Sequence, residues 1–377
     1  MTDVLVAGAG VAGLSVAWRA AQRGLSVTVV DEAPGTGASY AAAGMLAPVA
    51  EAAYGEEALV ALSRASLELY PGFVAELQEA SGTDVGLRTA GTLLVGFDED
   101  DVRALDHVHA FHRELGLAAD RLTPRACRAQ EPALSPRLRG GVRVRGDHSV
   151  EPRALHAALL SAAGAAGVEV VRARVGALVV EDGRATGLEL ASGRRLQAPQ
   201  TVLALGAWSG QLAGVPQGSV PVRPVKGQIL RLQGEPLLDG TVRALVRGRQ
   251  VYLVPYGADR VVVGASVEEQ GFDGRVTAGA VLDLLRDATE VVPGLTELEL
   301  VETLARWRPG TPDNGPLLGP SALPGLVLAT GHYRNGVLLA PLTGRVVADV
   351  LAGDDLSGPA AAFAGDRFSA RTALETA

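Results

Sequence analysis

Cysteine is nearly absent from this chain, because Cys127 is the only one in 377 residues. A single cysteine excludes an intrachain disulfide, a Cys-x-x-Cys redox pair and a metal cluster held by several thiolates. We therefore expect a reducing, cytoplasmic location. No metal site is predicted from the histidines either, since the spacing of His107, His109 and His112 does not place three ligands on one helix face. We expect these three on a solvated face of a helix.

Long apolar runs are missing as well, and no stretch of 18 consecutive apolar residues occurs. The uncharged stretch at residues 4–18 is too short to span a membrane. It also lacks the basic start of a signal peptide, because Asp3 precedes it. The sequence therefore predicts no transmembrane segment and no membrane partner.

Positive charge is in deficit, with 34 Lys and Arg residues against 42 Asp and Glu, for a formal net charge of −8. Nucleic-acid binding needs clustered positive charge, so the composition favours a small-molecule partner. Lysine occurs once, as Lys226. Two interpretations stay open: this position needs a compact ammonium group, or one lysine has persisted by chance.

Glycine is abundant, with 47 residues in a chain that is 47% hydrophobic and 20% charged. This composition is typical of a globular protein with many tight turns. The length of 377 residues exceeds that of a typical single domain, so we expect two domains.

Three glycines near the N-terminus, Gly8, Gly10 and Gly13, separate an apolar strand from a helix. In a dinucleotide-binding unit the first makes the turn, the second admits a pyrophosphate, and the third allows close packing of helix and strand. Asp31 follows the next strand, where its carboxylate can bind a ribose hydroxyl and would repel a 2′-phosphate. The pattern favours FAD or NAD over an ordinary glycine-rich turn, without separating the two.

Periodicity predicts most of the remaining elements. Helices are expected at 56–81, after Pro152 and at 277–289, and strands at 89–97, 169–198, 201–210, 221–266, 298–310 and 325–331. The segment GHYRNGVLLAP at 331–341 precedes an apolar run, and we expect a helix to begin within RNGVLLAP. On its own this segment is also compatible with an ordinary strand-to-helix turn. The tail after Leu351 is expected to be loosely attached.

Several motifs together resemble one family. They are GAGVAG at 8–13, AAAGML at 41–46, VKGQ at 225–228, VYLVP at 251–255, RPGTPDNGPLLG at 308–319 and GHYRNGVLLAP at 331–341. In this order they resemble the D-amino-acid-oxidase (DAO) family of FAD-dependent oxidoreductases, over residues 3 to about 350. Within the family, the resemblance is greatest to the glycine oxidases of thiamine biosynthesis.

The resemblance implies an α/β fold with two domains. One is a Rossmann-type FAD-binding domain, formed by residues 1–82, 147–217 and 318–377. The other is a β-rich substrate domain with an antiparallel sheet, formed by residues 83–146 and 218–317.

The resemblance also implies FAD bound without a covalent link, since Cys127 lies far in sequence from the C-terminal motif that carries the linking cysteine in covalent relatives. Free N–H groups at the start of the last helix would stabilise negative charge on the reduced flavin. The residues expected to contact FAD are Gly8, Gly10, Val11, Ala12, Gly13, Asp31, Ala42, Ala43, Gly44, Met45, Val175, Gly206, Trp208, His332, Arg334, Asn335, Gly336, Val337 and Leu338.

For the substrate, the resemblance implies that Arg308 clamps the carboxylate, with help from the Tyr252 hydroxyl. The backbone carbonyl of Arg334 would accept a hydrogen bond from the substrate amine. Arg306 is expected to be solvated or supporting. Val267 stands where the glycine oxidases carry a methionine, which enlarges the expected pocket and leaves strict glycine preference open.

The expected reaction is oxidative deamination of glycine or a similar small amino acid. Hydride passes from Cα to flavin N5, O2 reoxidises the flavin to give H2O2, and the imino acid hydrolyses to a keto acid and ammonia. The alternatives are an oxidase of sarcosine or D-amino acids, a dehydrogenase with another electron acceptor, and a flavin-binding protein without catalysis. Assembly into a homo-oligomer is left open.

Overall fold

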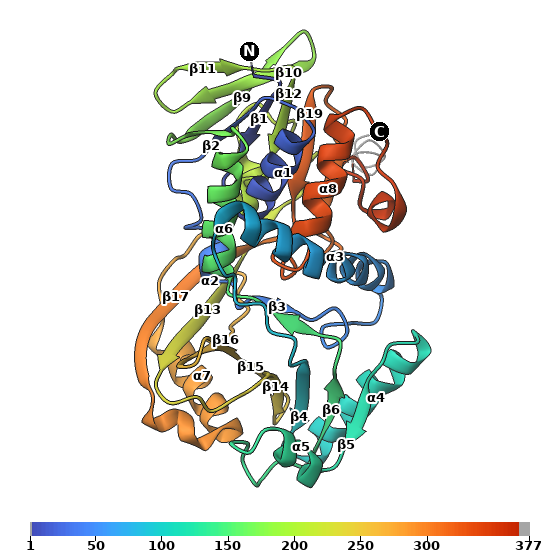
Figure 1. The fold of residues 1–377 in the computed structure, drawn as a ribbon, viewed down its shortest axis with the longest axis vertical. Coiled ribbons are helices and arrows are strands. Elements are labelled where there is room, and N and C mark those ends of the chain that lie inside the picture. The colour runs from blue at the N-terminus through green and yellow to red at the C-terminus, as the bar shows by residue number, and fades with distance from the viewer. Residues whose placement is uncertain (1, 369–377) are drawn as a thin grey trace.

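The computed structural model describes residues 2–368, which form two layered units (Figure 1). Residues of both units line a common cavity. Residue 1 and residues 369–377 of the predicted FAD-binding domain lie outside the described residues. Within residues 2–368, no helix combines the length and the apolar character needed to cross a membrane.

The first unit is built on a six-stranded sheet with the order β18-β19-β12-β1-β2-β8. All neighbouring pairs are parallel except β18 with β19. Its strands are β1 (Val4–Ala7), β2 (Val27–Val30), β8 (Glu169–Val171), β12 (Gln200–Leu203), β18 (Leu317–Pro320) and β19 (Leu326–Thr330).

Both faces of this sheet are covered, which explains why strands β1 and β2 are buried along their whole length. Val4 and Val6 pack with the helices on one face, and Leu5 and Ala7 pack with a three-stranded sheet on the other. The helices are α1 (Val11–Gln22), α3 (Glu57–Ser81), α6 (Pro152–Ala165) and α8 (Ala340–Leu351). The covering strands are β9 (Val175–Glu181), β10 (Arg184–Leu190) and β11 (Arg195–Gln197).

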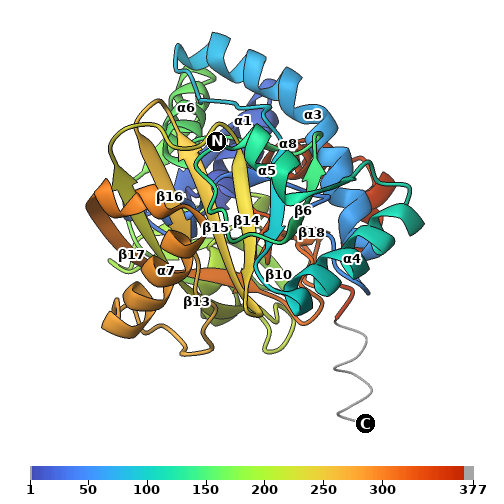
Figure 2. The same ribbon diagram turned by 90° about the horizontal axis from the view of Figure 1, so that it is seen from below.

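The second unit is an eight-stranded sheet with the order β17-β13-β16-β15-β14-β4-β6-β5. Its pairs are antiparallel except that β4 and β14 run parallel. The strands are β4 (Thr92–Gly96), β5 (Asp120–Leu122), β6 (Gly140–Val144), β13 (Arg223–Gln233), β14 (Thr241–Val246), β15 (Arg249–Tyr256), β16 (Arg260–Gly264) and β17 (Glu299–Gly310). Seen from below, α7 (Ala278–Val291) lies toward the β17 side of this sheet and α4 (Glu99–Glu114) toward the β6 side (Figure 2).

Short elements complete the chain. They are α2 (Ala38–Ala41), β3 (Met45–Leu46), α5 (Pro124–Gln130), β7 (His148–Ser149) and the 3₁₀ helices η1 (Gly206–Gln211), η2 (Pro293–Glu297) and η3 (Gly358–Phe363). The two large sheets confirm the predicted α/β fold with an antiparallel β-rich unit. The exact domain boundaries stay a prediction.

Some expectations about local structure are wrong. The strand expected at 201–210 ends at Leu203 and gives way to η1, because Gly206 adopts a left-handed φ of 56°. His112 is buried rather than solvated. The tail after Leu351 is anchored as far as it is described: Phe363 is buried, and Arg367 pairs with Asp313 at 2.9 Å.

Candidate active site

A cavity of about 1210 Å³ runs from the glycine-rich turn after β1 to the side chain of Arg308 on β17. Pockets for drug-sized ligands usually measure about 300–1,000 Å³. This cavity therefore has room for a large ligand together with a small one.

The N-terminal turn at one end of the cavity requires its glycines. Gly8 has a φ of 107°, and a Cβ on it would lie 2.4 Å from the Ala204 carbonyl oxygen. A Cβ on Gly13 would lie 2.0 Å from the Gly8 carbonyl oxygen, so this residue joins helix to strand and does not line the cavity. Gly10, by contrast, lines the cavity, and its Cβ position is free of backbone. The open side of the turn, at Gly10, therefore faces the cavity, where the phosphate groups of a ligand would fit.

Asp31 lies at the end of β2 and lines the cavity as expected. Its carboxylate oxygens accept hydrogen bonds from the backbone N–H groups of Ala9 at 2.7 Å and Ala33 at 2.8 Å. Asp31 thus braces the glycine turn, and its contact with a ribose stays a prediction. Glu32 also lines the cavity and offers a second carboxylate, although the spacing from the glycine turn predicted only Asp31.

Most of the other predicted cofactor residues line the same cavity. They are Val11, Ala12, Ala42, Ala43, Gly44, Met45, Val175, Gly206, Trp208, His332, Arg334, Gly336 and Val337. Asn335 and Leu338 are buried next to this wall without lining it. The contacts of all these residues with FAD stay predictions.

The segment before α8 has free amides beside the cavity. Helix α8 begins at Ala340, with Pro341 in its first turn, so the helix begins within RNGVLLAP as expected, near the end of that segment. The Tyr70 hydroxyl donates to the Val337 carbonyl at 2.8 Å, and the Ser66 hydroxyl donates to the Leu338 carbonyl at 2.7 Å. Because a trans peptide directs its N–H opposite to its C=O, the Leu338 N–H points away from α3.

Within residues 2–368, the N–H groups of Gly336, Val337 and Leu338 have no hydrogen-bond acceptor. Amides without partners are rare in folded proteins, and because Gly336 and Val337 line the cavity, their N–H groups fit an acceptor on a bound ligand. The nearby His332 is buried and its ring bonds to the Thr343 hydroxyl at 2.9 Å. Burial lowers the pKa of His332 to about 4, so its ring is neutral near pH 7. These residues fit a flavin cofactor, whose negative charge on reduction would be stabilised by the free amides.

Arg308 stands at the other end of the cavity. Its Nη1 donates to the Ser266 carbonyl at 3.1 Å, and among the described residues no acidic side chain pairs with its guanidinium. A Cβ on Gly227 would lie 2.4 Å from this nitrogen, so glycine at that position makes space for the guanidinium. The result is an arginine with unused donors beside the cavity, as a carboxylate-binding site requires.

Tyr252 lies beside Arg308 and also lines the cavity. A Cβ on Gly264 would lie 2.3 Å from the tyrosine hydroxyl, so a second glycine gives this side chain its place. Burial raises the pKa of Tyr252, while the charge of Arg308 acts in the opposite direction. The hydroxyl is therefore protonated near pH 7 and able to donate a hydrogen bond.

Three other arginines that line the cavity already have partners. Arg334 pairs with Glu56 at 3.5 Å, and Arg243 pairs with Glu51. Arg306, expected to be solvated or supporting, donates to the Thr36 carbonyl at 2.8 Å, which favours the supporting role. Arg308 thus differs from Arg334 and Arg243, whose guanidinium groups already pair with carboxylates.

Sequence reasoning missed several residues of the wall. Glu51, Arg243 and Gln250 line the cavity, yet they belong to segments without a recognisable motif. An aromatic cluster of Trp208, Phe272 and Trp307 has ring centroids 5.2 to 5.6 Å apart. Long-range packing brings these rings together; Trp208 was expected at the cofactor, whereas no local pattern marks Phe272 and Trp307.

The sequence predicted that Cys127 lies away from the flavin and that Val267 lies in the substrate pocket. Cys127 is buried in the core of the eight-stranded sheet and does not line the cavity, which is consistent with FAD held without a covalent link. Burial raises the pKa of its thiol to about 11, which makes it a poor nucleophile. Val267 lines the cavity and is 63% exposed.

Comparison with known proteins extends these observations. Residues 3–350 match the family described as DAO, FAD dependent oxidoreductase. The chain is 34% identical over 377 residues to the glycine oxidase of Geobacillus kaustophilus, and the match covers 99% of each. It is 34% identical over 351 residues to the bifunctional protein ThiO/ThiG of Nostoc sp., covering 93% of this chain and 52% of that protein. The chain thus spans about half the length of the latter relative.

Solved structures show the same likeness over nearly the whole chain. The crystal structure of glycine oxidase from Geobacillus kaustophilus gives a TM-score of 0.89 at 34% identity, covering 97% of this chain and 98% of that one. The structure of iminodiacetate oxidase from Chelativorans sp. BNC1 gives a TM-score of 0.85 at 28% identity, covering 96% and 98%. The similarity therefore includes both sheets and the elements that enclose the cavity.

Proposed function

Because the chain belongs to the DAO family of FAD dependent oxidoreductases, we propose that it oxidises glycine or a similarly small amino acid. The observation that carries the proposal is Arg308, which lines the cavity and has no acidic partner among residues 2–368. A substrate carboxylate would supply the negative charge that this guanidinium lacks.

FAD is the cofactor of this family, and the cavity wall from Gly8 to Val337 would hold it. Bound FAD would take a hydride from the substrate Cα and pass electrons to O2 to give H2O2. The protein's own part is to bind, orient and shield the reacting groups.

Arg308 and Tyr252 would bind the substrate carboxylate together, the first through its guanidinium and the second through its hydroxyl. Each side chain occupies space that a glycine leaves open: a Cβ on Gly227 would clash with Arg308, and a Cβ on Gly264 would clash with Tyr252. The backbone carbonyl of Arg334 would accept a hydrogen bond from the substrate amine. Two anchored ends would leave a small amino acid with few orientations, which favours reaction at Cα.

The likeness to a ThiO/ThiG protein supports a place for this reaction in the synthesis of the thiazole of thiamine. Direct use of O2 and a cytoplasmic location belong to the same proposal.

A second candidate is oxidation of a slightly larger substrate, such as sarcosine or D-alanine. The side chain of Val267 is more than half exposed on the cavity wall, so space remains beside it. The similarity to an iminodiacetate oxidase supports this alternative, because that substrate is itself a glycine with a substituted nitrogen.

Anaerobic titration of the purified holoprotein would test the proposal. Glycine should bleach the visible absorption of the bound FAD, and admission of O2 should restore it with release of H2O2. Parallel titrations with sarcosine and D-alanine rank the two candidates. If none of the three substrates reduces the flavin, the proposed function is wrong.

A further inference from the structure

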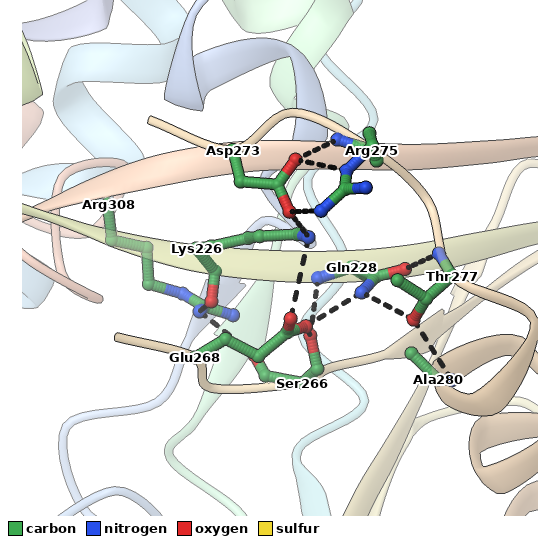
Figure 3. Close-up of polar contacts among 9 residues, drawn as sticks. All are labelled: Lys226, Gln228, Ser266, Glu268, Asp273, Arg275, Thr277, Ala280 and Arg308. Atoms are coloured by element: carbon green, nitrogen blue, oxygen red, sulfur yellow. Dashed lines mark hydrogen bonds and ion pairs between the residues drawn. The ribbon is translucent and has the colours of Figure 1, made fainter. Parts of the chain in front are cut away.

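The single lysine of the chain, Lys226, is completely buried on β13. Its Nζ lies 3.4 Å from a carboxylate oxygen of Glu268 and 3.4 Å from one of Asp273 (Figure 3). Removing an ammonium group from water is costly unless opposite charges and hydrogen bonds compensate. Two carboxylates from one loop provide that compensation, so the ammonium and the loop depend on each other.

This loop, residues 265–277, connects β16 to α7 and forms part of the cavity wall. Ala265 and Val267 line the cavity, and Phe272 stacks on Trp208 with ring centroids 5.2 Å apart. The position of the loop therefore sets the shape of the pocket at the substrate end.

Gln228, two residues after Lys226, fastens both ends of the same loop (Figure 3). Its backbone N–H donates to the Ser266 hydroxyl at 2.8 Å, and its side-chain amide donates to Glu268 at 2.7 Å. Its side-chain carbonyl accepts from the Thr277 N–H at 2.9 Å. The loop is thus held to β13 by two adjacent buried side chains on the same strand.

The network ends at the substrate clamp. The Ser266 carbonyl accepts the Arg308 hydrogen bond at 3.1 Å, and the Ser266 hydroxyl donates to Glu268 at 2.5 Å. The backbone of Lys226 itself pairs with Glu268 through two hydrogen bonds of 3.0 Å. A carboxylate bound by Lys226 is therefore bonded to the residue that orients the Arg308 guanidinium.

We propose that Lys226 is a positioning residue for substrate binding: its ammonium fixes loop 265–277 so that Ser266 holds Arg308 toward the substrate. A compact ammonium suits this task, because its three donors reach carboxylates on two different residues, whereas a guanidinium fork matches one carboxylate. This accounts for a lysine in a chain whose other basic residues are all arginine. The inference rests on the proposed function only in assuming that Arg308 binds a carboxylate.

The test compares wild type with Lys226→Met, which keeps the length of the side chain and removes its charge. Acetate serves as a non-reacting carboxylate, and its Kd is read from the shift it causes in the visible spectrum of bound FAD. In Lys226→Met, the acetate Kd and the KM for glycine should each rise about tenfold, the size of one misaligned charge-assisted hydrogen bond. The kcat should change much less, because the clamp acts on binding.

Arg275→Ala is the matched control, since Arg275 contacts the same Asp273 carboxylate from solvent and is itself exposed. The acetate Kd of this variant should stay within about twofold of wild type, as is usual for exposed ion pairs. An equal rise in both variants would mean that the buried ammonium has no special role.

A double-mutant cycle separates positioning from general destabilisation. Lys226→Met should lower kcat/KM about tenfold in wild type but have almost no effect in an Arg308→Ala background. Equal losses in both backgrounds would overturn the proposal. If Lys226→Met does not fold, Ser266→Ala takes its place in the same cycle, because it removes the hydroxyl that joins Glu268 to the backbone of β13 and so breaks the same network between Lys226 and Arg308.

The acetate measurement also distinguishes failure of this proposal from failure of the proposed function, because acetate binding requires no oxidation. If wild type binds acetate through Arg308 but does not oxidise glycine, the proposed function fails while the coupling between Lys226 and Arg308 is still measured.

Discussion

Replacing Arg308 by alanine is the sharpest test of how this protein holds its substrate. The guanidinium Nη1 donates to two backbone carbonyls, that of Ser266 at 3.1 Å and that of Lys226 at 3.5 Å, and no carboxylate within residues 2–368 pairs with it, so its other donors are available to a ligand. Truncating one partner of a buried charge pair costs about 2–5 kcal/mol. At 1.4 kcal/mol for each factor of ten, kcat/KM for glycine should fall by about 30-fold to 4,000-fold.

The assay is steady-state H2O2 production, accompanied by the visible spectrum of the bound flavin. FAD should stay bound in Arg308→Ala, because Arg308 lies at the end of the cavity remote from the glycine turn. Arg306→Ala is the control: Arg306 also lines the cavity, but its guanidinium already bonds to the Thr36 carbonyl. Near-normal kcat/KM in Arg308→Ala would refute the reasoning, and Arg334 would become the next candidate for the clamp.

The other predictions concern the cofactor, the substrate range and the response to pH. Acid precipitation should release intact FAD into the supernatant, since Cys127 is buried away from the cavity; flavin retained in the pellet would contradict this. Val267→Met should raise the ratio of kcat/KM for glycine to kcat/KM for D-alanine by the equivalent of about 1–3 kcal/mol, the discrimination that one methylene group usually gives in a pocket. An unchanged ratio would show that another side chain limits the space. His332 should make the folded state less stable on acidification, because its folded pKa of about 4 lies below the ordinary value of 6.5. The unfolded chain binds this proton first, so the free energy of unfolding should drop as the pH falls from 6.5 toward 4, by about 3 kcal/mol at most. Urea unfolding of His332→Gln beside wild type should show a weaker pH dependence in the variant, and parallel curves would assign the effect to other groups.

The sequence predicted those parts of the fold whose signals are local and strong. The 56–81 helix is observed as α3 (Glu57–Ser81), and the extended segment at 298–310 is observed as β17 (Glu299–Gly310). Both have a long amphipathic or extended pattern that neighbouring structure does not overrule. The glycine turn was equally readable, because backbone contacts at Gly8 and Gly13 admit no side chain.

The remaining features depend on contacts between distant segments. The turn before α8 is held by Tyr70 and Ser66 from α3, which no pattern in residues 331–341 reveals. Glu51 reaches Arg243 across almost two hundred residues of sequence, so neither could be assigned to the cavity beforehand. Lys226 could be singled out in the sequence as the one lysine of the chain, but its burial and its two carboxylate partners depend on the folded structure.

The interleaved order of the strands has a consequence for the newly made chain. The first sheet places β19, from Leu326 to Thr330, between β12 and β18, and the second sheet joins β4 to β14 across more than a hundred residues. The first sheet cannot be completed before Thr330 has left the ribosome, nor the second before Gly310, although domains usually fold as successive units during synthesis. Gly336 and Val337 on the cavity wall come later still. Cofactor capture must therefore follow translation of the chain as far as Val337, and a chain truncated before residue 326 would have no complete pocket to offer.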